Sequence, residues 1–167
     1  MFWLLLHDRL WTATRRKRHG LQVEDDCALC SQEPESADHL TTACVFARKV
    51  WFRVLASLGL AAVAPQPATS ITDWWLSSRA RIGEQLKRGL DSLLILGAWW
   101  LWKERNRRFF DGISLTPVAV VHKIEEEADK WSQAGYSNLA KLLGSSTELS
   151  DVGSLCSRDI SSYVIAR

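Results

Sequence analysis

Apolar residues recur at helical spacing through the first third of the chain, and glycines interrupt the pattern. Residues 3–11 place Trp3, Leu6 and Leu10 on one face, which predicts a helix. A short helix is expected at residues 14–18, stopped by Gly20. Residues 44–58 repeat the pattern with a wider apolar stripe and precede a glycine.

Apolar residues recur at helical spacing in the rest of the chain as well, so the sequence predicts a mainly α-helical protein. Helices are expected to begin at residues 71–76, to run from Asp91 to residue 108, and to follow the cap Thr116 and Pro117 as far as Gly135. We expect a domain at 1–60, a proline-containing linker at 61–70, a helical tryptophan-rich region at 71–143 and a serine-rich, disordered tail at 144–167.

Four potential metal ligands lie within eighteen residues of the first domain. Cys27, Cys30, His39 and Cys44 follow the order C-x2-C-x8-H-x4-C. Three thiolates and one imidazole complete a tetrahedral shell and leave no position for water, so we predict one structural Zn²⁺. Ser36 or Asp38 could cap a short helix that carries the histidine. The alternative is that these cysteines fill a core or form a disulfide with one left over; Cys156, in the tail, is given no role.

Charge is unevenly distributed although the net charge is only +2. Residues 1–20 carry a net charge of +4, residues 21–44 carry −6, and Arg48, Lys49 and Arg53 add +3 directly afterwards. A zinc loop this acidic is a poor surface for phosphate, so a nucleic-acid contact would fall on its flanks. The candidate contact residues are a basic run and the tryptophan before it: Trp11, Arg15, Arg16, Lys17 and Arg18. A solvated basic face is the alternative reading of this run.

A second basic cluster is a weaker candidate for nucleic-acid contact. It consists of Lys103, Arg105, Arg107 and Arg108 and is interrupted by Glu104. The preceding run of ten apolar residues, 93–102, is about half the length of a membrane span, which favours a helix with Trp99, Trp100 and Trp102 in the core or at a domain contact. With no signal sequence either, we expect an intracellular protein of the cytoplasm or nucleus, neither secreted nor bound to a membrane.

The four ligands and their flanks resemble a known family. Residues 10–22, which read LWTATRRKRHGLQ, the ligand segment, and residues 46–51, FARKVW, are similar to the zinc-binding domain downstream of the polymerase in reverse transcriptases of plant non-LTR (LINE-type) retrotransposons. Residues 99–106, WWLWKERN, resemble the segment that follows this domain. The resemblance covers about residues 3–112 and implies that Cys27, Cys30, His39 and Cys44 bind zinc.

The resemblance implies no catalytic residue, and the sequence predicts that the chain is not an enzyme. The adjacent carboxylates Asp25 and Asp26 lie in an acidic loop without the apolar hairpin that a polymerase needs around its catalytic metals. We expect the tail of a polyprotein, starting at an internal methionine. The expected partners are RNA or single-stranded DNA and a reverse transcriptase polymerase domain, with no small-molecule substrate. Two alternatives stay open: a scaffold that docks on a polymerase, and a decayed remnant without function.

Overall fold

The computed structural model describes residues 1–144, and within this range helices predominate and no β-strand forms. The prediction of a mainly α-helical protein is confirmed. The predicted tail and Cys156 lie outside the described residues, apart from Gly144. The helical elements are α1 (Phe2–Leu6), α2 (Ala13–Arg18), η1 (His39–Ala43), α3 (Val45–Ser57), η2 (Ala61–Val63), α4 (Ile71–Ala80), α5 (Glu84–Asn106), η3 (Arg107–Asp111) and α6 (Pro117–Gln133).

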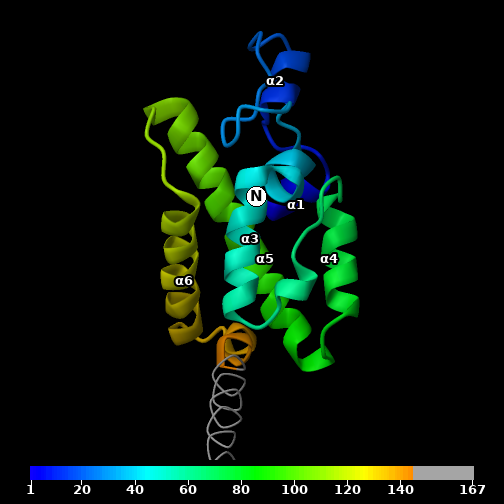
Figure 1. Cartoon of the computed structure of the whole chain (residues 1–167), viewed down its shortest axis with the longest axis vertical. Helices are drawn as coiled ribbons and strands as arrows, with labels where there is room; N and C mark the ends of the chain where they lie inside the picture. Colours follow the sequence, from blue (N-terminus) through cyan, green and yellow to red (C-terminus); the bar gives the residue numbers. More distant parts are fainter. Residues whose placement is uncertain (145–167) are drawn as a thin grey trace, which may run out of the picture.

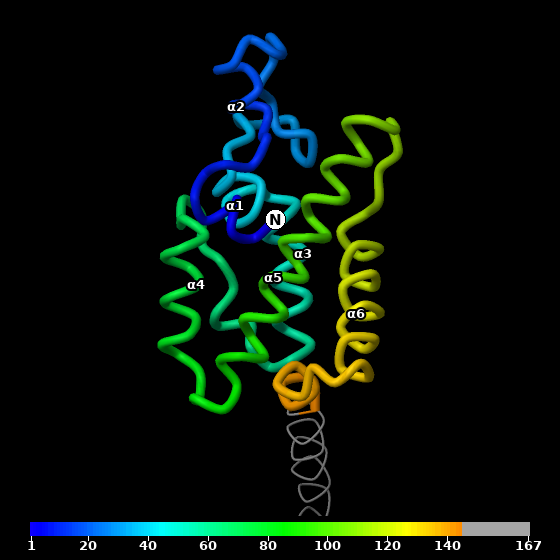
Figure 2. Tube along the Cα trace, turned by 180° about the vertical axis from the view of Figure 1, so that it is seen from behind, coloured from blue at the N-terminus to red at the C-terminus, as the bar shows by residue number. Residues whose placement is uncertain are grey.

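Four long helices run along the long axis of the molecule (Figure 1). Seen from behind, α5 passes between α4 and α6 (Figure 2). Helix α3 packs mainly against α6, and its Trp51 reaches Gly97 of α5. Helix α2 and the loop that follows it lie at one end, and a helical segment at 137–144 lies at the other. The metal-binding motif is therefore carried at one end of a helical bundle.

A single hydrophobic core joins the zinc motif to the helices that follow it. The buried cluster includes Cys27 and Cys44 as well as side chains of α3, α4, α5 and α6. Trp51 of α3 is fully buried, and its indole Nε1 donates to the carbonyl of Thr41 at 2.7 Å. Gly97 of α5 permits this packing, since a Cβ there would lie 2.2 Å from the Trp51 ring. One core thus spans the regions on both sides of the predicted linker.

Several predicted helix ends are confirmed by their caps. The Thr12 hydroxyl accepts a hydrogen bond from the backbone of α2, and Thr116 caps α6 in the same way, with Pro117 at the first helical position. Gly20 and Gly59 follow α2 and α3 with φ of 69° and 70°. This left-handed conformation is easily adopted by glycine and ends a helix.

Two predicted helices have different bounds. The first ends at Leu6 and not at residue 11, because Asp8 takes a left-handed φ of 48°. Helix α5 begins at Glu84, seven residues before Asp91. Asp91 does not cap it: its carboxylate accepts a hydrogen bond from the indole of Trp75 and pairs with Arg79, both on α4. Of the tryptophans predicted in the core or at a domain contact, Trp100 is buried, whereas Trp99 is 42% exposed and does not belong to the core.

Candidate metal centre

Cys27 and Cys30 lie on a tight turn built by backbone hydrogen bonds. The Cys27 amide donates to Glu33 O at 2.9 Å, which folds the acidic loop back on itself, and the Ser31 amide donates to Cys27 O at 2.8 Å. The backbone N–H groups of Leu29 and Gln32 point at the sulfurs of Cys27 and Cys30. A hydrogen bond from a backbone N–H group to a sulfur favours the thiolate, which is the form that binds a metal.

His39 and Cys44 come from the two ends of η1, a single π-helical turn. The Cys44 amide donates to His39 O at 2.7 Å, an i to i+5 hydrogen bond that brings residues five apart onto one side of the turn. An α-helix would separate them by about 140° around its axis. The His39 amide donates to the hydroxyl of Ser36 at 3.0 Å, so Ser36 is the cap that the sequence predicted. Asp38 instead accepts a hydrogen bond from the Ile71 amide at the start of α4.

The structure brings the four predicted ligands together. Their donor atoms all lie within 4.8 Å of one another. The sulfurs of Cys27 and Cys44 are 3.9 Å apart, and Cys30 Sγ is 3.3 Å from His39 Nε2. Zn–S bonds of about 2.3 Å in a tetrahedral shell require about 3.8 Å between sulfurs, and the sulfur to nitrogen distance is slightly shorter. The set therefore fits one structural zinc ion, with Nε2 as the histidine donor.

The pKa values of the two most buried thiols, Cys27 and Cys44, are shifted in opposite directions. The hydrogen bond to Cys44 raises the pKa of Cys27, and burial raises it further. The same bond lowers the pKa of Cys44, helped by the backbone N–H groups of Ala47 and Phe46 at the start of α3. Cys44 is thus already biased toward the thiolate, and a bound cation deprotonates a coordinating thiol outright. Cys27, Cys30 and Cys44 are all free cysteines, so the structure does not support a disulfide among them.

A buried ion pair ties the zinc loop to α5. Glu35 and Arg105 are 0% and 1% exposed, and Glu35 Oε1 lies 2.8 Å from Arg105 Nη2. The carboxylate also accepts hydrogen bonds from the backbone amides of Ala13, at the start of α2, and Ala28, between the first two ligands, at 2.8 and 3.3 Å. Neither role follows from the sequence, in which Glu35 is one of the six acidic residues of 21–44 and Arg105 is a candidate for nucleic-acid contact.

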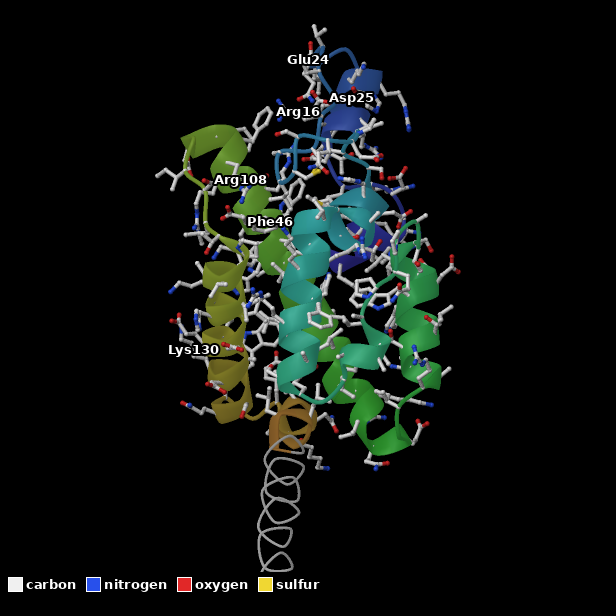
Figure 3. All side chains as sticks on the ribbon, viewed as in Figure 1. Arg16, Glu24, Asp25, Phe46, Arg108 and Lys130 are labelled. Carbon is white, nitrogen blue, oxygen red and sulfur yellow. The ribbon has the colours of Figure 1, made fainter. Side chains whose placement is uncertain are left out.

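Arg108 forms a second connection between α5 and the zinc loop. Its guanidinium donates to the carbonyl of Leu29 at 2.9 Å and to Leu115 O at 2.9 Å, and pairs with the buried carboxylate of Glu104. It also lies over the ring of Phe46, two residues after the last ligand, as Figure 3 shows. Arg105 and Arg108 therefore have structural roles. Of the four cations in the second basic cluster, only Lys103 and Arg107 remain candidates for nucleic-acid contact.

The predicted nucleic-acid residues lie on and beside α2, which stands at one end of the molecule (Figure 1). Trp11 is 48% exposed. The guanidinium carbon of Arg15 lies 5.2 Å from the centroid of its ring, and the centroid of the His19 ring lies 5.4 Å from it. Arg15 donates to the carbonyl of Asp8 at 2.7 Å, and Arg16 lies over Phe109. Lys17 forms an ion pair with Asp25 at 2.8 Å. Arg18 is exposed.

A comparison with known families supports the assignment of the metal centre. Residues 1–51 match the family described as zinc-binding in reverse transcriptase. The N-terminal third of the chain thus carries the features of a reverse-transcriptase zinc-binding domain, which is an accessory and not the catalytic domain. No curated protein and no solved structure matches the chain.

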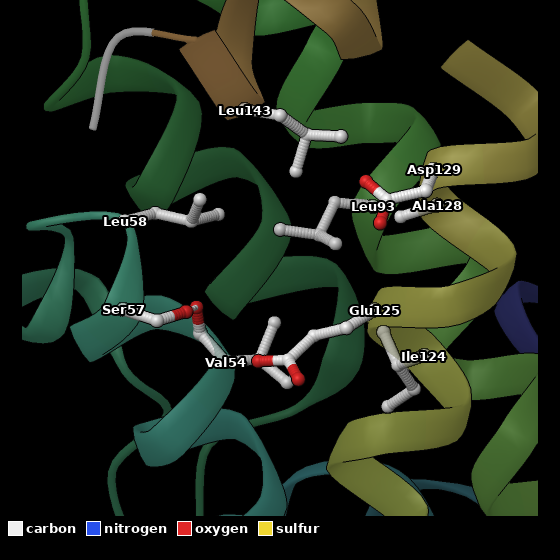
Figure 4. Close-up of a pocket in the computed structure, with 9 residues that line it drawn as sticks. All are labelled: Val54, Ser57, Leu58, Leu93, Ile124, Glu125, Ala128, Asp129 and Leu143. Atoms are coloured by element: carbon white, nitrogen blue, oxygen red, sulfur yellow. Dashed lines mark hydrogen bonds between the residues drawn. The ribbon is translucent and has the colours of Figure 1, made fainter. Parts of the chain in front are cut away.

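Elsewhere, residues 1–144 offer no second group of ligands close enough to hold a metal. A cavity of about 390 Å³ lies between α3, α5 and α6, with apolar side chains such as Leu58 and Leu93 facing Glu125 and Asp129 of α6 (Figure 4). These two carboxylates are one helical turn apart.

None of the helices in the described part of the chain combines the length and apolar character needed to cross a membrane.

Proposed function

We propose that the chain is a non-catalytic accessory module, related to a LINE-type plant retrotransposon reverse transcriptase, which binds nucleic acid through the basic flank of its zinc loop. The observation that supports this most is the position of α2. Four successive cations, Arg15 to Arg18, lie on α2 at one end of the molecule, the first two half-buried and the last two exposed. Among the described residues only Lys17 has a carboxylate partner. Cations with accessible charge release counterions from phosphate on binding. The proposed location is the cytoplasm or nucleus.

Zinc has an indirect role in this proposal. Helix α2 has only six residues, which is too short to be stable alone. Two hydrogen bonds and an ion pair hold it to the zinc loop. The Ala13 amide donates to the Glu35 carboxylate, the Thr14 amide donates to the Glu35 carbonyl, and Lys17 pairs with Asp25. The metal would fix the loop, and the loop would hold the basic helix in place.

The test is the salt dependence of binding to a fluorescein-labelled single-stranded RNA, with the zinc-loaded full chain. Replacing Arg15, Arg16 and Arg18 together by Gln should weaken binding and reduce the slope of log K against log salt by about 2, which is three contacts at about 0.7 each. Lys17 is left in place because it pairs with Asp25. Zinc content and circular dichroism should not change. An unaltered slope would assign the basic run to solvation.

The competing function is a scaffold that docks on a polymerase domain. It is supported by exposed apolar side chains on the turn between α5 and α6, where Phe110 and Ile113 are 67% and 59% exposed. A docking surface of this kind would show binding to protein with little dependence on salt. The same titration therefore separates the two functions.

A further inference from the structure

The outward face of α3 carries a basic and aromatic groove that the functions above do not use. The groove has a volume of about 850 Å³ and lies between α3, the segment after η2 and the start of α6. Val45, Lys49 and Phe52 line it at helical spacing, with Arg48 and Arg53 beside them. The opposite face of α3 is the one that packs into the core.

The cations of this groove are not neutralised by the protein. No carboxylate lines the groove, and within residues 1–144 no carboxylate pairs with Arg48, Lys49 or Arg53. Arg48 Nε is buried and has no hydrogen-bond acceptor among the described residues. Arg48, Lys49 and Arg53 thus give the groove a charge of +3.

The aromatic and apolar side chains of the groove are also accessible to solvent. Phe52 is 56% exposed and Val118 is 43% exposed. Pro117 and Val118 belong to the first turn of α6, which contains no acidic residue. The N-terminal end of this 17-residue helix adds a partial positive charge at the border of the groove. Positive charge along a groove beside an exposed aromatic ring is the arrangement that binds single-stranded nucleic acid.

We propose that this groove binds a short single-stranded nucleic-acid segment, with Arg48, Lys49 and Arg53 on its phosphates and Phe52 stacked on a base. The inference rests on the proposed nucleic-acid function and assigns it a second contact surface, independent of α2. Val45 is the residue after the ligand Cys44, so the groove begins where the metal centre ends. A loaded zinc site would hold the near end of the groove in shape.

The test compares variants of the zinc-loaded full chain for binding of labelled oligo(U) across a range of salt concentrations. Arg48→Gln, Lys49→Gln and Arg53→Gln together should reduce the salt slope by about 2. Phe52→Leu keeps an apolar side chain but removes the ring; it should weaken binding about tenfold without changing the slope. A control with Arg88→Gln, Lys123→Gln and Lys141→Gln removes the same charge from exposed positions outside the groove and should leave the slope near its original value.

The outcomes separate this inference from the proposed function. If the groove variants bind oligo(U) like the original chain while the α2 variant loses affinity, the groove is not a contact surface and the proposed function stands. If the original chain binds no oligonucleotide, both are overturned. A poly-glutamate peptide that binds as tightly as oligo(U), with no effect of Phe52→Leu, would assign the groove to an acidic protein and also overturn the inference. Unchanged zinc content and circular dichroism in each variant exclude misfolding.

Discussion

At the scale of single residues, the buried carboxylate of Glu35 connects three parts of the molecule. It accepts hydrogen bonds from α2 and from the turn between Cys27 and Cys30, and it pairs with Arg105 of α5. Because the carboxylate and the guanidinium are both removed from water, each depends on the other for compensation of its desolvation. Removing one partner leaves the other as an unpaired buried charge.

We therefore predict that Glu35→Ala will lower the free energy of unfolding of the zinc-loaded chain by about 3–5 kcal/mol. Urea unfolding followed by circular dichroism measures this. Glu35→Leu combined with Arg105→Met should recover part of the loss, since neither charge then remains buried. The control is Asp25→Asn, which removes an ion pair with exposed Lys17 and should change the midpoint little. A loss in Glu35→Ala no larger than in this control would contradict the structural role.

The zinc ligands could be predicted from the sequence, whereas Glu35 could not, for a physical reason. All four ligands lie within eighteen residues, and the chemistry of the metal fixes their types and spacing. Glu35 is one of six acidic residues in 21–44, and nothing local distinguishes it from Glu33 or Asp38. Its partner lies 70 residues away, and only the fold brings the two together.

At the scale of elements, caps were predictable and a helix start without a side-chain cap was not. Thr116 and Ser36 each accept a hydrogen bond from the backbone amide three residues later, which is a local pattern. Helix α5 begins after Gly83 with no side-chain cap, so the sequence favoured Asp91, which the structure uses to join α5 to α4. The π-helical turn of η1 has no local signature in the sequence either; its i to i+5 hydrogen bond places His39 and Cys44 on one side of the turn.

Zinc removal should unfold some elements and spare others. With a chelator, amides of α2 and of residues 26–44 should exchange with solvent faster, because their hydrogen bonds enclose the metal shell. Amides in α5 and α6 should stay protected, since these helices bury residues such as Leu94 and Ile124 in an apolar core. Hydrogen exchange by mass spectrometry of the full chain measures both. Equal loss in α5 and α6, or no change at 26–44, would contradict this division.

At the scale of the whole molecule, the zinc loop and the long helices form one structure. The fragment 1–60 would expose the face of α3 that contains Val50, Val54 and Leu55, so the full chain is the appropriate object for every measurement. The loop is acidic and the surfaces around it are basic, at α2 on one flank and at α3 on the other. This arrangement places the metal as a structural centre and leaves binding to its flanks.

The central claim is one structural zinc ion held by three sulfurs and one nitrogen. X-ray absorption of the purified full chain, together with metal analysis, tests it most directly. We predict one zinc per chain, with three sulfurs at about 2.3 Å and one nitrogen at about 2.0–2.1 Å. Cys44→Ser should lose the metal, and Cys156→Ser, outside the described residues, should keep it. Two zinc ions per chain, or a shell with an oxygen in place of a sulfur, would contradict the account.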